Sequence, residues 1–177
     1  DAISEVAEGL MKDLRAAGIT VKFDNRDTHK PGWKFNQYEL QGVPVRIAIG
    51  PKDLEKGSVE VARRDTLTKQ FMQQDEVATA IPALLDEIQA SLFEKALSFR
   101  EENSLTADTW EEFKELMKGN PGFVYAHWDG TTETEDKIKD LTKATIRCIP
   151  LNNNQEEGKC ILTGNPSTQR VVFAKAY

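Results

Sequence analysis

The chain contains few cysteines and lacks any long apolar stretch. Its two cysteines, Cys148 and Cys160, cannot form the multiple disulfides of a small secreted domain. No apolar run approaches the roughly 20 residues that a membrane-spanning helix needs. Residues 1–14 have the pattern of an amphipathic helix and not of a secretory signal. We therefore expect a soluble, cytoplasmic protein without a membrane partner.

Motifs for catalysis are also missing. The sequence has no Gly-rich phosphate-binding loop and no strand–turn–helix nucleophile motif. The two histidines, His29 and His127, are far apart in sequence and have no motif around them, which favours a packing or surface role. The glutamate pairs Glu101–Glu102 and Glu111–Glu112 fall on predicted amphipathic helices, where a solvated face is the simpler interpretation. We expect no catalysis by this chain alone.

Charge is distributed unevenly along this acidic chain, whose net charge is -6. Residues 22–70 contain 10 lysines and arginines against 7 acidic residues, whereas residues 71–121 contain 4 against 11. A net charge of this sign argues against general coating of nucleic acid. The local excess of cations in residues 22–70 nevertheless indicates a polyanion partner for that segment.

The first half of the chain alternates predicted helices and strands. Apolar residues at helical spacing indicate helices, and alternation of apolar and polar residues indicates strands. Helices are predicted at residues 1–14, 33–41 and 77–99, and strands at 19–23, 43–49, 59–64 and 68–72, the last two as a hairpin. Val45 and Ile47 share one face of their strand, which leaves Arg46 on the other. This order predicts an α/β layer structure with a mixed β-sheet and flanking helices.

The second half begins after a polar joint at residues 101–105. Helices are predicted at residues 110–117 and 133–141, and strands at 123–128, 145–150, 159–162 and 171–174. We expect two domains, residues 1–103 and a small α+β domain at residues 104–177.

Residues 31–69 contain side chains suited to reading an RNA base. A guanine offers acceptors on one edge and N–H donors on another, so its reader needs Arg or Lys together with a carboxylate. Arg46, Arg64 and Lys69 supply the cations on the strands, and Lys34 and Glu39 lie on the predicted short helix.

Two aromatic residues in the same segment, Trp33 and Phe35, could stack on a base and contribute about 1–3 kcal/mol. The alternative is that both aromatics are core residues and that Glu39 pairs with a neighbouring lysine. The chemistry of these residues leaves both interpretations open.

Four motifs follow one another between Pro31 and Lys69. They are the opening Gly-Trp-Lys-Phe-Asn, an arginine shortly after Gly-Val-Pro, the turn Ile-Gly-Pro-x-Asp, and the hairpin Arg-Arg-Asp-Thr. In these motifs the segment closely resembles the anticodon-binding domain of prolyl-tRNA synthetases, which are class II synthetases. The resemblance implies the fold of that domain and recognition of tRNA(Pro).

The resemblance also implies roles for particular residues. In similar synthetases an acidic residue on the short helix, an arginine on the next strand and a hairpin lysine read the two guanines of the proline anticodon. Glu39, Arg46 and Lys69 occupy these motif positions. The surrounding motif contains further candidates, which are Lys34, Arg64, Asp24 and Arg26.

The second half resembles the C-terminal domain of the archaeal and eukaryote-like branch of this family, which often holds zinc with four cysteines. Asp129, Thr134 and Leu162 stand at three of those positions, and only Cys160 remains. Because structural zinc needs four ligands, we predict that zinc is absent and that apolar packing holds this domain together. The alternative is a replacement metal site built from Asp129, Cys148, Cys160 and His127.

The resemblance covers only the C-terminal part of such an enzyme, and we expect the chain to be a fragment. It implies a parent that attaches proline to tRNA(Pro) with ATP and Mg²⁺, that forms a homodimer when full-length, and whose catalytic domain contacts the terminal Tyr177. A strand that precedes the first helix in the family would also be missing, and no cofactor is expected in this chain. The alternative function is a free-standing anticodon-fold module that binds RNA or protein and has no ligase activity.

Overall fold

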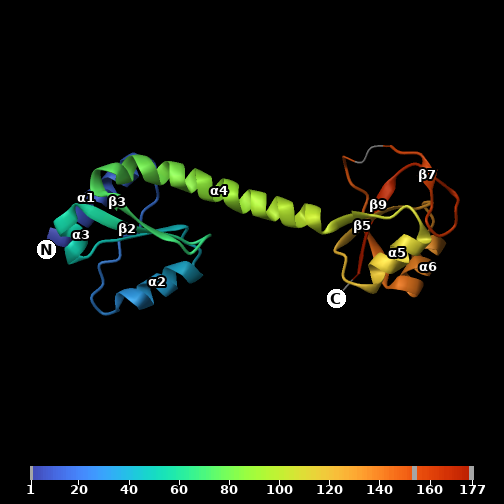
Figure 1. Cartoon of the computed structure of the whole chain (residues 1–177), viewed down its shortest axis with the longest axis horizontal. Helices are drawn as coiled ribbons and strands as arrows, with labels where there is room; N and C mark the ends of the chain where they lie inside the picture. The colour runs from blue at the N-terminus through green and yellow to red at the C-terminus, as the bar shows by residue number, and fades with distance from the viewer. Residues whose placement is uncertain (1, 153–154, 176–177) are drawn as a thin grey trace. The chain divides into compact units, whose positions relative to one another are not determined.

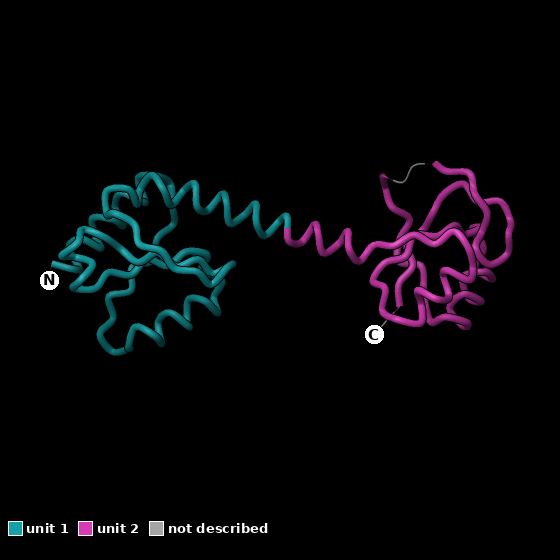
Figure 2. Tube along the Cα trace, viewed as in Figure 1, with its two compact units in different colours: residues 1–94 teal, residues 95–177 magenta. Residues whose placement is uncertain are grey.

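The structure is a computed structural model that describes residues 2–152 and 155–175. The chain divides into two compact units, residues 1–94 (unit 1) and residues 95–177 (unit 2), as Figure 2 shows. Each unit has a hydrophobic core of its own. Tyr177, for which a contact with another domain is expected, lies outside the described residues.

Unit 1 consists of a three-stranded sheet with helices on both sides (Figure 1). Its strands are β1 (Val45–Ala48), β2 (Ser58–Arg63) and β3 (Lys69–Gln73). Its helices are α1 (Ala2–Ala16), α2 (Pro31–Leu40), α3 (Pro51–Lys56), the 3-10 turn η1 (Gln74–Glu76) and the first part of α4 (Val77–Glu102). The strands follow the order β1-β2-β3 and both pairs are antiparallel. The predicted hairpin is confirmed.

The two faces of this sheet differ in character because side chains alternate along each strand. The first face packs against α1 and α4 and forms the core, with Val59, Val61, Leu14, Val77 and Ile81 among its buried residues. The second face carries polar and charged side chains and lies on the side of α2 (Figure 1). Arg46 lies on this second face, as predicted.

The strand predicted at residues 19–23 is wrong. Ile19, Val21 and Phe23 are half-buried and alternate with exposed residues, so the burial pattern is that of a strand. However, the segment forms no β-ladder with another strand in the described part of the chain. The carbonyl of Val21 instead accepts a hydrogen bond of 3.1 Å from the Arg15 guanidinium. Alternation indicates burial on one side and does not reveal whether a pairing strand is present.

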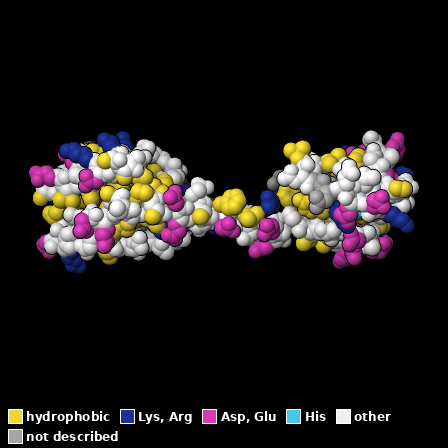
Figure 3. All heavy atoms as spheres, turned by 90° about the horizontal axis from the view of Figure 1, so that it is seen from above, with side chains coloured by type: hydrophobic (Ala, Val, Ile, Leu, Met, Phe, Trp, Pro, Cys, Tyr) yellow, Lys and Arg dark blue, Asp and Glu magenta, His cyan; other side chains and the backbone are white. Residues whose placement is uncertain are grey.

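Helix α4 confirms the long helix predicted at residues 77–99. Its apolar stripe is buried at Val77, Ile81, Leu84 and Ile88. The stripe then continues onto an exposed surface, where Leu92, Phe93 and Phe99 are 47%, 59% and 68% exposed; Figure 3 shows hydrophobic side chains exposed along this helix. Within residues 2–152 and 155–175, we find no helix with the length and apolar character needed to cross a bilayer.

Unit 2 contains a four-stranded mixed sheet covered by two helices. After the end of α4, its elements are β4 (Ser104–Thr106), α5 (Trp110–Lys118), β5 (Phe123–His127), α6 (Thr132–Thr142), β6 (Ala144–Cys148), β7 (Gly158–Lys159), β8 (Pro166–Ser167) and β9 (Arg170–Lys175). The order is β4-β5-β9-β6, with β4 and β5 parallel and the other pairs antiparallel. The predicted fold class, α/β with a mixed sheet and flanking helices, is confirmed for the chain; the mixed sheet lies in unit 2, whereas the sheet of unit 1, for which a mixed sheet was predicted, is antiparallel.

The polar joint predicted at residues 101–105 is wrong, because α4 runs to Glu102 and β4 starts at Ser104. Among the described residues this strand lies at the edge of the sheet and pairs with β5 alone, so polar residues cost little there. Helix α5 begins with a capping box, in which the Thr109 backbone N–H donates a hydrogen bond to the Glu112 carboxylate. Phe113 of this helix packs edge-on against Phe173, with the ring centres 5.1 Å apart.

Candidate nucleic-acid interface

Helix α2 positions the candidate residues nearest the start of the motif region. Pro31 begins the helix, where its missing N–H removes no intrahelical hydrogen bond. Gly42 follows the helix with φ of +81°, a left-handed conformation that favours glycine and turns the chain into β1. None of the side chains on α2 is fully buried, and Trp33 is 47% exposed. The alternative that Trp33 and Phe35 are both core residues is therefore wrong for Trp33.

Asp24 anchors a polar cluster at the start of α2. Its carboxylate accepts hydrogen bonds from the Arg26 guanidinium at 2.6 and 2.9 Å and from the Tyr38 hydroxyl at 3.1 Å. The Lys34 ammonium lies 3.6 Å from the same carboxylate and donates to the Asp24 carbonyl at 3.2 Å.

The electrostatics of this cluster follow from these contacts. Hydrogen bonds from Arg26 hold the pKa of the Asp24 carboxyl well below its usual range. Burial, followed by the hydrogen bond to Asp24, raises the pKa of Tyr38. The structure thus brings Asp24, Arg26 and Lys34 together, and the Asp24 carboxylate is already used in holding the two cations.

Arg46 and Lys69 converge on one carboxylate of the second sheet face. Arg46 Nη1 lies 3.2 Å from Glu60 Oε1, and Lys69 Nζ lies 3.2 Å from the same oxygen. Strand register explains the arrangement, because Ala62 of β2 pairs with Arg46 on one side and with Lys69 on the other. The side chain of Lys69 is 54% exposed, so its ammonium remains open to an anion.

Arg46 is also packed against α2. Its guanidinium carbon lies 3.6 Å from the centre of the Phe35 ring, a cation–π contact. Its Nε is buried and has no hydrogen-bond partner among the described residues. Phe35 and Glu39 are four residues apart and so share one face of α2. Arg46, Lys69 and Glu39 therefore border the same side of unit 1.

Glu39 and Arg64 meet at the end of α2. The Arg64 Nε donates a hydrogen bond of 2.8 Å to the backbone carbonyl of Glu39, and the Arg64 backbone N–H donates to the Pro44 carbonyl. The exposed Glu39 carboxylate forms no ion pair or hydrogen bond with any residue that the structure describes. The alternative in which Glu39 pairs with a neighbouring lysine is therefore wrong for this structure.

Two residues of the second sheet face were not predicted, Glu60 and Phe71. They are direct partners across β2 and β3. The signal for Glu60 was its position between Val59 and Val61, which places its side chain on the face opposite the core. Phe71 gave no such signal, because an aromatic residue in a strand usually indicates burial.

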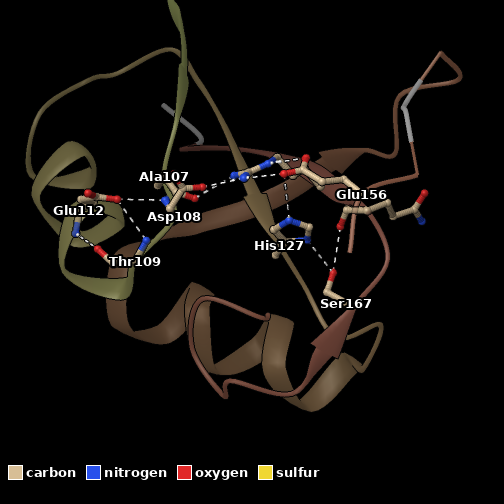
Figure 4. A network of polar contacts seen from close by, with 9 residues as sticks. Ala107, Asp108, Thr109, Glu112, His127, Glu156 and Ser167 are labelled. Carbon is tan, nitrogen blue, oxygen red and sulfur yellow. Dashed lines mark hydrogen bonds and ion pairs between the residues drawn. The ribbon is translucent and has the colours of Figure 1, made fainter. Parts of the chain in front are cut away.

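Unit 2 contains a separate polar network, drawn in Figure 4, around the buried His127. His127 Nδ1 lies 3.0 Å from Ser167 Oγ, which in turn donates to the Gln169 carbonyl at 3.0 Å. Glu156 Oε1 lies 3.7 Å from His127 Nε2. The Ser167 hydroxyl thus lies within hydrogen-bond distance of both the imidazole and the Gln169 carbonyl, and these contacts hold the His127 ring in place.

Arg170 joins this network through the carboxylates of Glu156 and Asp108. It forms two hydrogen bonds with the Glu156 carboxylate, at 3.0 and 3.1 Å, and one of 2.6 Å with Asp108. The hydrogen bonds from Arg170 lower the pKa of the Glu156 carboxyl. The network joins the segment before β7 to β9 and the start of α5, which is a structural role. The packing role predicted for His127 agrees with its burial.

The residues at the four cysteine positions do not fit a zinc ion. The Asp129 carboxylate accepts hydrogen bonds from Thr131, Thr134, Thr163 and Asn165, at 2.8 to 3.3 Å. A carboxylate saturated by these donors, a hydroxyl at Thr134 and an apolar side chain at Leu162 do not make a tetrahedral ligand set. Partial burial would raise the pKa of Asp129, but the hydrogen bonds from Thr163, Thr131 and Thr134 outweigh it and hold the pKa at about 2. Hydrogen bonds to one carboxylate thus link the two loops that carry these positions.

Comparison with known proteins agrees with the two-unit fold. Residues 1–84 match the family described as anticodon binding domain, and residues 110–177 match the family described as prolyl-tRNA synthetase, C-terminal. The chain corresponds to the C-terminal part of a prolyl-tRNA synthetase.

Curated relatives match over nearly the whole chain. It is 63% identical to a proline–tRNA ligase from Christiangramia forsetii, over 100% of the chain and 36% of that protein. It is 56% identical to a proline–tRNA ligase from Porphyromonas gingivalis, over 99% of the chain and 35% of that protein. It is 54% identical to one from Flavobacterium johnsoniae, over 99% of the chain and 36% of that protein. The chain thus spans about a third of the length of these relatives.

Proposed function

We propose that unit 1 reads the anticodon of tRNA(Pro) within a proline–tRNA ligase. The observation that carries this proposal is the meeting of Arg46 and Lys69 at Glu60, beside the face of α2 that bears Glu39. This side of unit 1 offers cations for the acceptor edge of guanine and an unengaged carboxylate for its donor edge. The relatives named proline–tRNA ligase support the choice of tRNA(Pro).

The remaining candidates have supporting roles in this proposal. Arg64 fixes the end of α2 through the Glu39 carbonyl and so orients the Glu39 carboxylate. Asp24 orients Arg26 and Lys34, whose charges attract RNA phosphates. Phosphate contacts position an RNA, and contacts with base edges discriminate its sequence.

We also propose the setting in which unit 1 acts. A catalytic domain with ATP and Mg²⁺ forms the ester between proline and tRNA(Pro), in a cytoplasmic enzyme that works as a homodimer and belongs to the archaeal and eukaryote-like branch. Unit 2 works without zinc. The branch assignment is supported by the resemblance of residues 104–177, and the absence of zinc by the hydrogen bonds that occupy the Asp129 carboxylate. Metal analysis that finds equimolar zinc in the purified chain would overturn the latter.

The test is the affinity of the 177-residue chain for an RNA stem-loop with the tRNA(Pro) anticodon, measured at fixed salt. A second stem-loop has both anticodon guanines replaced by adenine. We expect the chain to prefer the first loop, and Glu39→Ala and Lys69→Ala to abolish the preference. Glu5→Ala and Lys12→Ala are matched controls on the exposed surface of α1 and leave the preference intact. Equal affinity for both loops contradicts anticodon reading and leaves phosphate attraction alone.

A further inference from the structure

Phe71 is an exposed aromatic residue on the edge strand β3 of the charged sheet face. It lies on β3, two residues after Lys69 and directly opposite Glu60 of β2, so its side chain shares the face of both. Its side chain is 70% exposed, although phenylalanine in a strand is normally covered. The core of unit 1 takes the opposite face of the sheet, so the packing of this unit does not explain Phe71.

The other two aromatic residues suited to stacking are already engaged. The Phe35 ring is covered by the Arg46 guanidinium at 3.6 Å. Trp33 is stacked on His29 with ring centres 3.9 Å apart, and the Arg26 guanidinium lies 5.5 Å from the Trp33 ring centre. Phe71 has no aromatic or cation–π partner among the described residues. Near Lys69, it is therefore the ring with a free π-face.

We propose that Phe71 is a stacking platform for an unpaired RNA base, next to the base that Lys69 contacts. This inference rests on the proposed function, because it concerns the same sheet face. A flat aromatic surface beside an exposed lysine suits two neighbouring unpaired nucleotides, with one base stacked on the ring and the acceptor edge of the next base facing the ammonium. A purely apolar protein partner would instead have to bury the charges of Lys69 and Glu60, which neighbour Phe71 on the same sheet face.

The experiment measures the affinity of Phe71 variants of the chain for the two stem-loops defined above. Every base has a π-face, so stacking on Phe71 should add to the affinity for both loops whatever their sequence. We therefore expect Phe71→Ala to weaken binding of both loops by about 5- to 150-fold and to leave the ratio of their affinities unchanged. Phe71→Tyr keeps the ring and retains affinity, whereas Phe71→Leu keeps apolar bulk and does not. Phe93→Ala, an exposed phenylalanine on α4, is the matched control and leaves affinity unchanged. Circular dichroism verifies that each variant is folded.

A second readout places the base on the ring. Each loop nucleotide in turn is replaced by fluorescent 2-aminopurine, whose emission changes when it stacks. We expect one position to respond to the wild-type chain and to lose that response with Phe71→Ala. Unchanged affinity with Phe71→Ala, or equal loss with Phe71→Tyr, overturns the stacking role.

The outcomes separate the two proposals. If Phe71→Ala has no effect while Glu39→Ala abolishes the guanine preference, anticodon reading stands and Phe71 serves another contact, such as a protein surface. If the wild-type chain binds both loops equally but Phe71→Ala weakens both, stacking stands and anticodon reading fails. Failure of the wild-type chain to bind either loop overturns both.

Discussion

Arg46 and Glu60 form an ion pair across β1 and β2, with Nη1 3.2 Å from Oε1. The same carboxylate oxygen lies 3.2 Å from the Lys69 ammonium. Glu60 thus holds two cations in fixed positions and also neutralises part of their charge. The carboxylate therefore weakens the attraction of this surface for a polyanion, but it also fixes the positions of the hydrogen-bond donors.

Glu60→Gln tests this balance. The substitution removes one negative charge, so Arg46 and Lys69 attract phosphate more strongly and affinity for either stem-loop rises, by at most about fivefold. Because the cations are no longer held by an ion pair, the preference for the guanine-containing loop falls. Titration of both loops measures the two effects. The control is Glu55→Gln on α3, an exposed carboxylate elsewhere in unit 1, and a preference that survives in Glu60→Gln would show that the pair does not position the cations.

Asp129→Asn tests the carboxylate that links the loops of unit 2. Three donors converge on its Oδ2, from Thr134, Thr163 and Asn165. Asparagine places an N–H₂ group against some of these donors, so we expect the free energy of unfolding of unit 2 to fall by about 1–3 kcal/mol. Urea unfolding is followed by tryptophan fluorescence in a Trp33→Phe background, which leaves Trp110 and Trp128 as reporters in unit 2.

The matched control for this variant is Asp136→Asn on α6, an exposed carboxylate in the same unit. It changes charge equally and is expected to leave unfolding within about 0.5 kcal/mol of wild type. Equal effects of the two substitutions would mean that charge alone, and not the hydrogen bonds to Asp129, determines the result.

The pKa of Asp129 predicts how the stability of unit 2 depends on pH. The hydrogen bonds hold its pKa at about 2 in the folded chain, against an ordinary value of 3.8. The depressed pKa means that its contribution is fully present above pH 3.8 and is lost as the pH falls towards 2. Unfolding free energy measured across this range should therefore decline less steeply in Asp129→Asn than in wild type. Parallel curves for the two proteins would contradict the assignment.

Much of the fold was predictable because local patterns determine it. The alternation around Arg46, the hairpin after Ser58 and the helix that begins at Val77 all appear in the structure. The segment at residues 19–23 was not predictable, since strand formation requires a partner that alternation does not reveal. Short β4 and β8 were missed because edge strands of two or three residues carry little apolar signal. The domain boundary after residue 103 stays a prediction.

The candidate site was predictable in its residue types but not in their partners. Lys69 and Arg46 were chosen by motif, yet their shared contact with Glu60 depends on the register of three strands. Asp24 was expected among the RNA-facing residues, whereas its carboxylate is engaged by Arg26, Tyr38 and Lys34. Whether the seven candidates bind RNA stays a prediction, because geometry gives their contacts and not their ligand.

Gly158→Ala tests the tight contact beneath the His127 network. A Cβ on Gly158 would lie 2.2 Å from His127 Nε2 and 2.5 Å from two further ring atoms, which is closer than atoms can approach. The imidazole must therefore move and lose its hydrogen bond to Ser167. We expect unit 2 to lose about 1–3 kcal/mol of stability, measured by the same urea unfolding.

Gly119→Ala is the matched control, because a Cβ there meets its nearest atom at an ordinary 3.8 Å. In a double variant, His127→Ala removes the ring that the new methyl group strikes, so Gly158→Ala should cost much less in that background. Coupling of this kind is expected only between residues in direct contact. If Gly158→Ala costs the same with and without the His127 ring, the loss arises from the backbone at residue 158 and the contact with His127 does not determine it.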